Sequence, residues 1–171
     1  MPIADITVHS YDGTKQKLDE SHPLAVTSVF GGTDSRDWQI ALYRDFALND
    51  NDKLITVPPT QQWQILTIYV VYTSSADQGA RQLQIDFRDQ TGVTYLDLRP
   101  NTTQIESLTR RYAIAPSLAN LTAFYDTEHL QTPLPPTIFL DASWSIRVFD
   151  NNNISATDDL DIFISYARRE V

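Results

Sequence analysis

The feature that most constrains the fold is the strict alternation of apolar and polar side chains in residues 81–89. Leu83, Ile85 and Phe87 are separated by single polar residues. In an extended chain, alternate side chains point to opposite faces, so these three would share one face. A repeat of two residues is typical of a strand with one buried and one wet face, and a helix does not produce it. The segment therefore predicts a half-buried β-strand.

Other segments predict more strands. Residues 63–72 carry apolar side chains on both alternating sets, which predicts a central strand covered on both faces. Residues 89–92 predict a hairpin turn in which Gly92 takes a positive φ. Residues 132–136 contain three prolines and predict an extended crossing segment, because proline cannot donate to a central ladder. The remaining strand candidates are 3–8, 24–30, 93–98, 124–125, 137–140, 144–150 and 160–166.

The strand candidates number roughly eight, with turns spaced about 8–12 residues apart, which is typical of a sandwich or jelly roll. Residues 38–43 and 103–130 fit either a strand or a helix. No clear amphipathic helices alternate with the strands, which excludes a parallel α/β fold. We therefore expect an all-β chain, an antiparallel β-sandwich resembling a jelly roll, with an N-terminal extension.

The 171 residues predict one domain, or one domain with an arm. We expect residues 58–171 to form the jelly-roll-like domain. Residues 1–57 consist of short strand candidates separated by polar loops. They fit either an arm that becomes ordered on a partner or the outer strands of the same domain, and both interpretations stay open.

The chain is acidic, since 13 lysines and arginines stand against 22 aspartates and glutamates and the formal net charge is −9 at pH 7. Tight nucleic-acid binding replaces counterions with basic side chains. The two basic doublets, Arg110–Arg111 and Arg168–Arg169, form no stripe. We therefore interpret them as surface charges and expect no nucleic-acid partner.

No apolar run approaches the roughly 20 residues that cross a bilayer, so we expect no membrane span. Residues 1–10 lack the layout of a signal peptide, which predicts a soluble protein made in a cytoplasm. The chain has no cysteine. This excludes disulfides, zinc-thiolate sites, iron–sulfur clusters and a cysteine nucleophile.

The residues that usually carry catalysis are scattered. No two of the three histidines have metal-ligand spacing, and there is no nucleophile elbow, phosphate-binding loop or dinucleotide motif. A glycosidase needs two carboxylates at a defined separation, and the sequence singles out no such pair. The histidines are His9, His22 and His129, and the glutamates are Glu20, Glu106, Glu128 and Glu170. We expect no enzymatic activity, no catalytic residues and no cofactor.

Two further groups of residues allow a functional and a structural interpretation. Residues 150–153, with Asp158, Asp159 and Asp161, supply the oxygens that calcium prefers. They lack the order of an EF-hand loop, and Asp and Asn also form turns, so we predict no metal site. Trp38, Trp63 and Trp144 suggest a sugar-binding platform. Trp63 and Trp144 are in phase with apolar strand faces, which favours core packing and leaves Trp38 as the more exposed one.

Five segments together resemble small virion structural proteins of tailed bacteriophages. The resemblance spans roughly residues 57–170 and follows a pattern of strands and turns without a catalytic signature. The segments are 62–70 (QWQILTIYV), 81–89 (RQLQIDFRD), 107–116 (SLTRRYAIAP), 140–150 (LDASWSIRVFD) and 156–161 (ATDDLD).

This resemblance implies a role in particle assembly, most directly as a capsid decoration (cement) protein. Such a protein would bind between major capsid subunits, stabilise the head, form a homo-oligomer (dimer or trimer) and reside in the virion capsid after synthesis in the host cytoplasm. Exposed sheet edges and an extended arm would let it add strands to neighbouring subunits. The alternatives are a tail, connector or fibre component of the virion, or a carbohydrate- or receptor-binding β-sandwich module.

Overall fold

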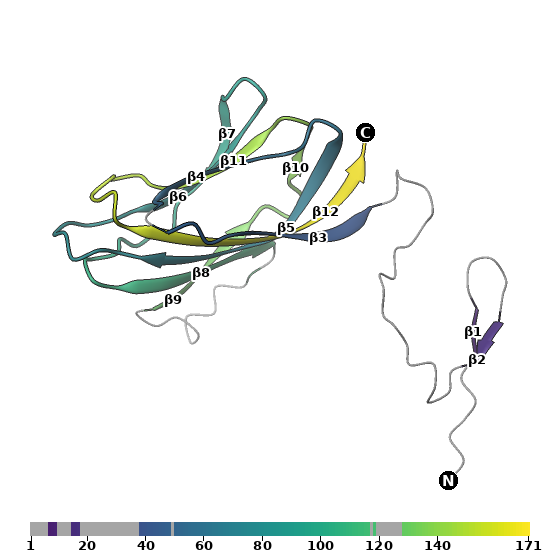
Figure 1. The fold of residues 1–171 in the computed structure, drawn as a ribbon, viewed down its shortest axis with the longest axis horizontal. Coiled ribbons are helices and arrows are strands. Elements are labelled where there is room, and N and C mark those ends of the chain that lie inside the picture. Colours follow the sequence, from purple (N-terminus) through teal and green to yellow (C-terminus); the bar gives the residue numbers. More distant parts are fainter. Residues whose placement is uncertain (1–6, 10–14, 18–37, 49, 117, 119–127) are drawn as a thin grey trace, which may run out of the picture. The chain divides into compact units, whose positions relative to one another are not determined.

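Figure 1 shows the fold in a computed structural model, which describes residues 7–9, 15–17, 38–48, 50–116, 118 and 128–171. The chain divides into two compact units, Met1–Gly31 and Gly32–Val171. In the first unit, β1 (Thr7–His9) pairs antiparallel with β2 (Lys15–Lys17). The strand candidates at 24–30 and 124–125 lie outside the described residues. Across the described ranges, no helix is long and apolar enough to cross a membrane.

The second unit is a sandwich of two β-sheets. The larger sheet has the order β3-β12-β5-β8-β9, with β10 pairing on β5, and the smaller one has the order β4-β11-β6-β7. In Figure 1 the smaller sheet lies above the larger one. The larger sheet comprises β3 (Gln39–Asp45), β5 (Gln61–Thr73), β8 (Thr109–Pro116), β9 (His129–Leu134), β10 (Phe139–Leu140) and β12 (Asp159–Glu170). The smaller sheet comprises β4 (Asp52–Thr56), β6 (Leu83–Arg88), β7 (Thr94–Leu98) and β11 (Ser145–Asp150).

Eight of these strands follow the jelly-roll connection. The chain runs from β3 in the larger sheet to β4 in the smaller one, back to β5, across to β6 and β7, and back to β8. After β9 and β10 it crosses again to β11 and returns to β12. The expected all-β, jelly-roll-like sandwich is therefore confirmed. One pair departs from the antiparallel rule, because β9 runs parallel to β8.

The core lies between the two sheets and follows the alternation of the strands. Leu83, Ile85 and Phe87 of β6 are each at most 1% exposed. They face Ile162 and Ile164 of β12 and similar residues within one continuous buried cluster. A strand is therefore present within residues 81–89, and its apolar set points inward. The expected wet face is wrong, because Gln84 and Asp86 are only 6% and 4% exposed. Their side chains bond each other at 2.6 Å, and Arg88 donates to Asp86 at 2.7 Å.

The prediction that residues 63–72 are covered on both faces is wrong. In β5 the buried set is Trp63 and Ile65, and it then changes phase to Ile68, Val70 and Tyr72. The opposite residues on β12 change register between Ser165 and Tyr166, so Leu66 is an extra residue in β5. Such a bulge moves the inward-facing set from odd to even positions. The other face is partly exposed, because a sheet of this sandwich has a second layer on one side only.

Strands β3 and β4 are outer strands of the two sheets. For these segments the structure agrees with the second of the two interpretations left open for residues 1–57, and the compact sandwich unit spans Gly32–Val171.

One boundary differs from expectation. Residues 132–134 complete the outer strand β9 rather than a crossing segment. Pro133 is tolerated there because an outer strand has one side without ladder partners.

The turn between β6 and β7 yields a test of local strain. Gly92 has a φ of +84°, and its N–H donates to the carbonyl of Asp89 at 3.0 Å. Side chains other than glycine are strained at such a φ, although asparagine tolerates it better. Gly92→Ala should therefore lower the free energy of unfolding by about 1 kcal/mol, and Gly92→Asn by less. Urea titration measures both values, and equal stability of the alanine variant and the wild type would contradict the strain.

Candidate interaction surface

The acidic and histidine residues considered for catalysis lie apart in the sandwich unit. Glu128 pairs with Arg111 of β8 at 3.3 Å, whereas Glu170 accepts a hydrogen bond from Gln61 at the start of β5. His129 begins the outer strand β9 and is exposed. Glu106 is half-buried in the loop before β8. His22 and Glu20 lie outside the described residues, and His9 ends β1. Among the described side chains, no group of three or more His, Asp or Glu is arranged to hold a metal ion.

In the Asp/Asn loop after β11, the side chain of Asp150 accepts hydrogen bonds from backbone N–H groups. Asp150 Oδ1 accepts hydrogen bonds from the N–H of Gln82 at 2.9 Å and of Asn152 at 3.1 Å. Its Oδ2 accepts one from the N–H of Ile154 at 3.1 Å. The carboxylate therefore forms a turn and links it to the start of β6, as the structural interpretation of this cluster holds.

A buried ion pair ties together the loops at this end of the sandwich. Arg81 and Asp158 are both fully buried, and Arg81 Nε donates to Asp158 Oδ2 at 2.9 Å. The guanidinium also donates to the carbonyl of Gly79 at 2.7 Å and to Ser75 Oγ at 3.1 Å. Asp158 in turn accepts the backbone N–H of Ser75 at 2.7 Å and the hydroxyl of Tyr72 at 3.1 Å. A buried charge needs such a full set of partners.

The ionisation of this pair follows from its surroundings. Burial by itself raises the pKa of Asp158, but the hydrogen bonds from Arg81 and Ser75 outweigh burial and hold the pKa below its ordinary value. Burial, and then the charges of Asp150 and Asp158, raise the pKa of the Tyr72 hydroxyl. The hydroxyl therefore stays protonated and donates. Sequence analysis missed Arg81 as a buried residue, because it stands next to an ordinary alternating strand and its partner lies 77 positions away.

The three tryptophans do not form one platform. Trp63 is 3% exposed and stacks on Tyr166 with ring centroids 3.9 Å apart. Trp144 is partly buried against the core and lies 5.1 Å from the ring of Tyr95. Trp38 lies 5.7 Å from the ring of Phe139, and the Arg169 guanidinium stands over its face at 5.0 Å. The expected core role of Trp63 is confirmed.

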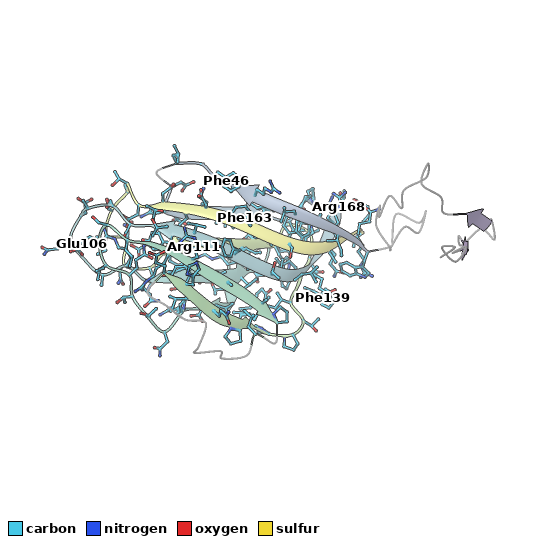
Figure 2. All side chains as sticks on the ribbon, turned by 90° about the horizontal axis from the view of Figure 1, so that it is seen from below. Phe46, Glu106, Arg111, Phe139, Phe163 and Arg168 are labelled. Atoms are coloured by element: carbon cyan, nitrogen blue, oxygen red, sulfur yellow. The ribbon has the colours of Figure 1, made fainter. Side chains whose placement is uncertain are left out.

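The outer face of the larger sheet carries a group of aromatic side chains. Phe163 of β12 points outward, because its neighbours Ile162 and Ile164 are buried in the core. The ring of Phe46 lies 5.0 Å from it, and that of Tyr69 lies 5.8 Å from it. Figure 2 looks onto this face and shows Phe46 and Phe163 close together.

Strand β3 extends this surface to the edge of the sheet. Ala41 and Tyr43 pack against the core, so the alternate residues Ile40 and Leu42 point outward. Ile40 is 65% exposed, Leu42 50% and Phe46 49%. We call Ile40, Leu42, Phe46, Tyr69 and Phe163 the apolar face. The rings of Tyr69 and Phe163 are half-buried, and Ser165 and Arg44 stand opposite Leu42 and Phe163 in the ladder. Apolar side chains gathered on one face are common at surfaces that bind other proteins.

The outer face of the smaller sheet has a different character. Arg147 Nε donates to Asp52 Oδ1 at 2.6 Å, and the same guanidinium lies 4.0 Å above the ring of Phe149. Arg88 pairs with Asp86 at 2.7 Å. Charged pairs therefore mark the outer face of the smaller sheet, and Leu54, opposite Arg147 in the ladder, is 60% exposed beside them.

Comparison with known proteins gives no family assignment. No model of a protein family matches the chain, and no curated protein matches it. Among solved structures, the infectious bursal disease virus Gx strain aligns at 9% identity with a TM-score of 0.33, over 99% of this chain and 42% of the other. The VP2 subviral particle of infectious bursal disease virus aligns at 12% identity with a TM-score of 0.25, over 78% of this chain and 41% of the other. The chain spans less than half of these proteins, and at such scores its function has to be argued from its own residues.

Proposed function

We propose that this chain is a structural virion protein of a tailed bacteriophage, and more specifically a capsid decoration protein that binds between major capsid subunits and stabilises the head. The apolar face carries the proposal. The core of the jelly roll lies between the two sheets, so side chains on the outer face do not contribute to it. These side chains include Phe46, Phe163, Ile40 and Leu42. Docking on a neighbouring subunit would remove them from water, at roughly 25 cal/mol per Å² of apolar area.

Three further observations support a role in assembly. The sequence resembles virion proteins of tailed phages over residues 57–170. The jelly roll is an architecture that capsid proteins use, although lectins and cupins share it. The buried Arg81–Asp158 pair and the charged pairs on the outer face of the smaller sheet suit a rigid module. Its apolar face would be directed at a partner.

The expected result of a binding experiment follows from the apolar face. The purified chain should bind heads of its phage that lack it and raise their thermal stability. Phe163→Gln should weaken this binding about ten-fold or more, because aromatic side chains at the centre of an interface contribute most to affinity. Sedimentation of heads with labelled protein measures the affinity, and differential scanning calorimetry measures the stability of the heads.

Phe149→Gln is the matched control, since it alters an outward aromatic residue on the smaller sheet. It should bind heads as the wild type does. Heads that neither bind the wild-type chain nor gain stability would overturn the decoration role. Quantitative mass spectrometry of particles then separates the alternatives, because a shell protein is present in hundreds of copies and a tail or connector protein in about six or twelve.

A further inference from the structure

Apart from the two-residue β10, which pairs only with β5, the sandwich has four outer strands among the described residues. They are β3 and β9 in the larger sheet and β4 and β7 in the smaller one. An outer strand carries backbone N–H and C=O groups without partners on one side, and it pairs with another chain unless something blocks it. The blocking devices are proline, short length, charges that point inward, and bulges.

Three of the four outer strands carry such devices. Pro133 interrupts β9. In β4, which has five residues, Lys53 points inward, is 2% exposed and pairs with Asp45 at 2.8 Å. Strand β7 also has five residues, of which Asp97 is the fourth, and it pairs irregularly near Arg88.

Strand β3 carries such a device only at its last residue, where Asp45 points inward to Lys53. It has seven residues and no proline, and it pairs regularly with β12 along its full length. Its outward side chains Ile40 and Leu42 are large, aliphatic and at least half exposed. Its charged residues, Arg44 and Asp45, occupy the last two positions. A long, apolar outer strand of this kind is a site for strand addition.

We propose that β3 pairs antiparallel with β3 of a second copy of this chain about a two-fold axis through Leu42. This inference rests on the proposed function, and it identifies a second copy of the chain as one partner of the sandwich in the assembled shell. Pairing that uses all seven residues of both strands places the central residue, Leu42, opposite itself. The two larger sheets then join into one continuous sheet, and the two apolar faces become one surface.

The self-pairing register is chemically complementary. It sets Ile40 opposite Arg44 of the second copy, whose aliphatic stem covers apolar surface while its charge reaches water. It sets Gln39 opposite Asp45 of the second copy, so an amide faces a carboxylate. Trp38 and Phe46, which flank the strand, also face each other across the two copies. No like charges meet, whereas a shift that centres the axis on Arg44 would bring two guanidinium groups together. Two identical β3 strands can therefore pair in this register without a clash of like charges.

A disulfide tests the register directly, because the chain has no cysteine of its own. Residues opposite each other across an antiparallel pair have Cα atoms about 4.5–5.5 Å apart, within the span of a disulfide. Leu42→Cys should therefore form covalent dimers under mild oxidation. Ile40→Cys should not, because the two copies of residue 40 would lie about 14 Å apart. Leu54→Cys, on the outer strand β4 and similarly exposed at 60%, should also stay monomeric on a reducing-agent-free gel.

The oligomeric state supplies the second measurement. Light scattering after size exclusion should give the wild-type chain twice its mass of 19.4 kDa. Leu42→Lys should give the mass of one chain, since it sets two ammonium groups opposite each other. Its far-ultraviolet circular dichroism spectrum should match that of the wild type, because the site is exposed. Leu54→Lys should remain a dimer. A wild-type monomer, or efficient crosslinking through Ile40→Cys, would overturn the inference.

The same variants separate this inference from the proposed function. A wild-type monomer that binds heads would leave the decoration role intact and remove the β3 pairing. A β3-linked dimer that fails to bind heads would do the reverse.

Discussion

Asp158→Ala is expected to lower the free energy of unfolding by about 3–5 kcal/mol, because it leaves the guanidinium of Arg81 buried without a counter-charge. Arg81 is 0% exposed, so water cannot replace the lost carboxylate. The substitution also removes the acceptor of the Tyr72 hydroxyl and of the Ser75 N–H. Urea titration followed by tryptophan fluorescence measures the change.

The matched control is Asp97→Ala. Asp97 also pairs with an arginine, Arg99 at 3.2 Å, but the two side chains are 50% and 51% exposed. Such surface pairs contribute about 0–1 kcal/mol, so this variant should unfold almost as the wild type does. A similar small change in Asp158→Ala would contradict the buried, fully bonded pair.

The same pair makes the free energy of unfolding depend on pH in acid. The pKa of Asp158 is lower in the folded chain than its ordinary value of 3.8, so folding is favoured by the ionised carboxylate. The contribution is complete above that ordinary value and is lost as the pH falls through the lower pKa of the folded state. Stability at neutral pH should therefore not change with pH through this group. In Asp158→Asn, this part of the acid-induced loss of stability should be absent.

Trp63→Ala is the second substitution with a large expected effect. Trp63 is 3% exposed, stacks on Tyr166 and donates its indole N–H to Gln61 at 2.9 Å. Removing a buried indole leaves a cavity, and such changes lower the free energy of unfolding by about 3–5 kcal/mol. Urea titration followed by far-ultraviolet circular dichroism is the suitable measurement, since the substitution itself alters the fluorescence.

Trp38→Ala serves as the comparison. Its ring lies partly exposed between Phe139 and Arg169, and its loss should cost about 1 kcal/mol or less. A stable Trp63→Ala variant with weakened glycan or head binding would show that Trp63 acts at a surface instead.

Particular strands show how much of the fold the sequence predicts. The alternation in residues 81–89 predicted β6 and its inward residues correctly, because a repeat of two is a property of one strand and needs no partner. The repeated strand and turn signals likewise predicted the all-β sandwich. The prediction that residues 63–72 are covered on both faces failed because Leu66 forms a bulge. A bulge is defined only by the register with the neighbouring strand, here β12.

The candidate surface was less accessible to sequence reasoning. Phe163 belongs to an apolar strand, and nothing local shows that Phe46, 117 positions earlier, lies 5.0 Å from its ring. The pairing of Arg81 with Asp158 was not predicted for the same reason, since the two residues are 77 positions apart. The distinction between a protected outer strand and an open one also needs the strand order, since Lys53 protects β4 only because it points inward toward Asp45.

The sequence by itself determined that the chain forms strands, which side chains of a regular strand share a face, and that the chain carries no familiar catalytic motif. Only the tertiary structure decided which strands pair, that β3 and β4 belong to the sandwich, and that the Arg81–Asp158 pair is buried. It also decided that β3 has no partner on one side among the described strands. The physical reason is that alternation arises from the geometry of a single extended chain, whereas pairing, burial and edges arise from hydrogen bonds and packing between segments far apart in sequence.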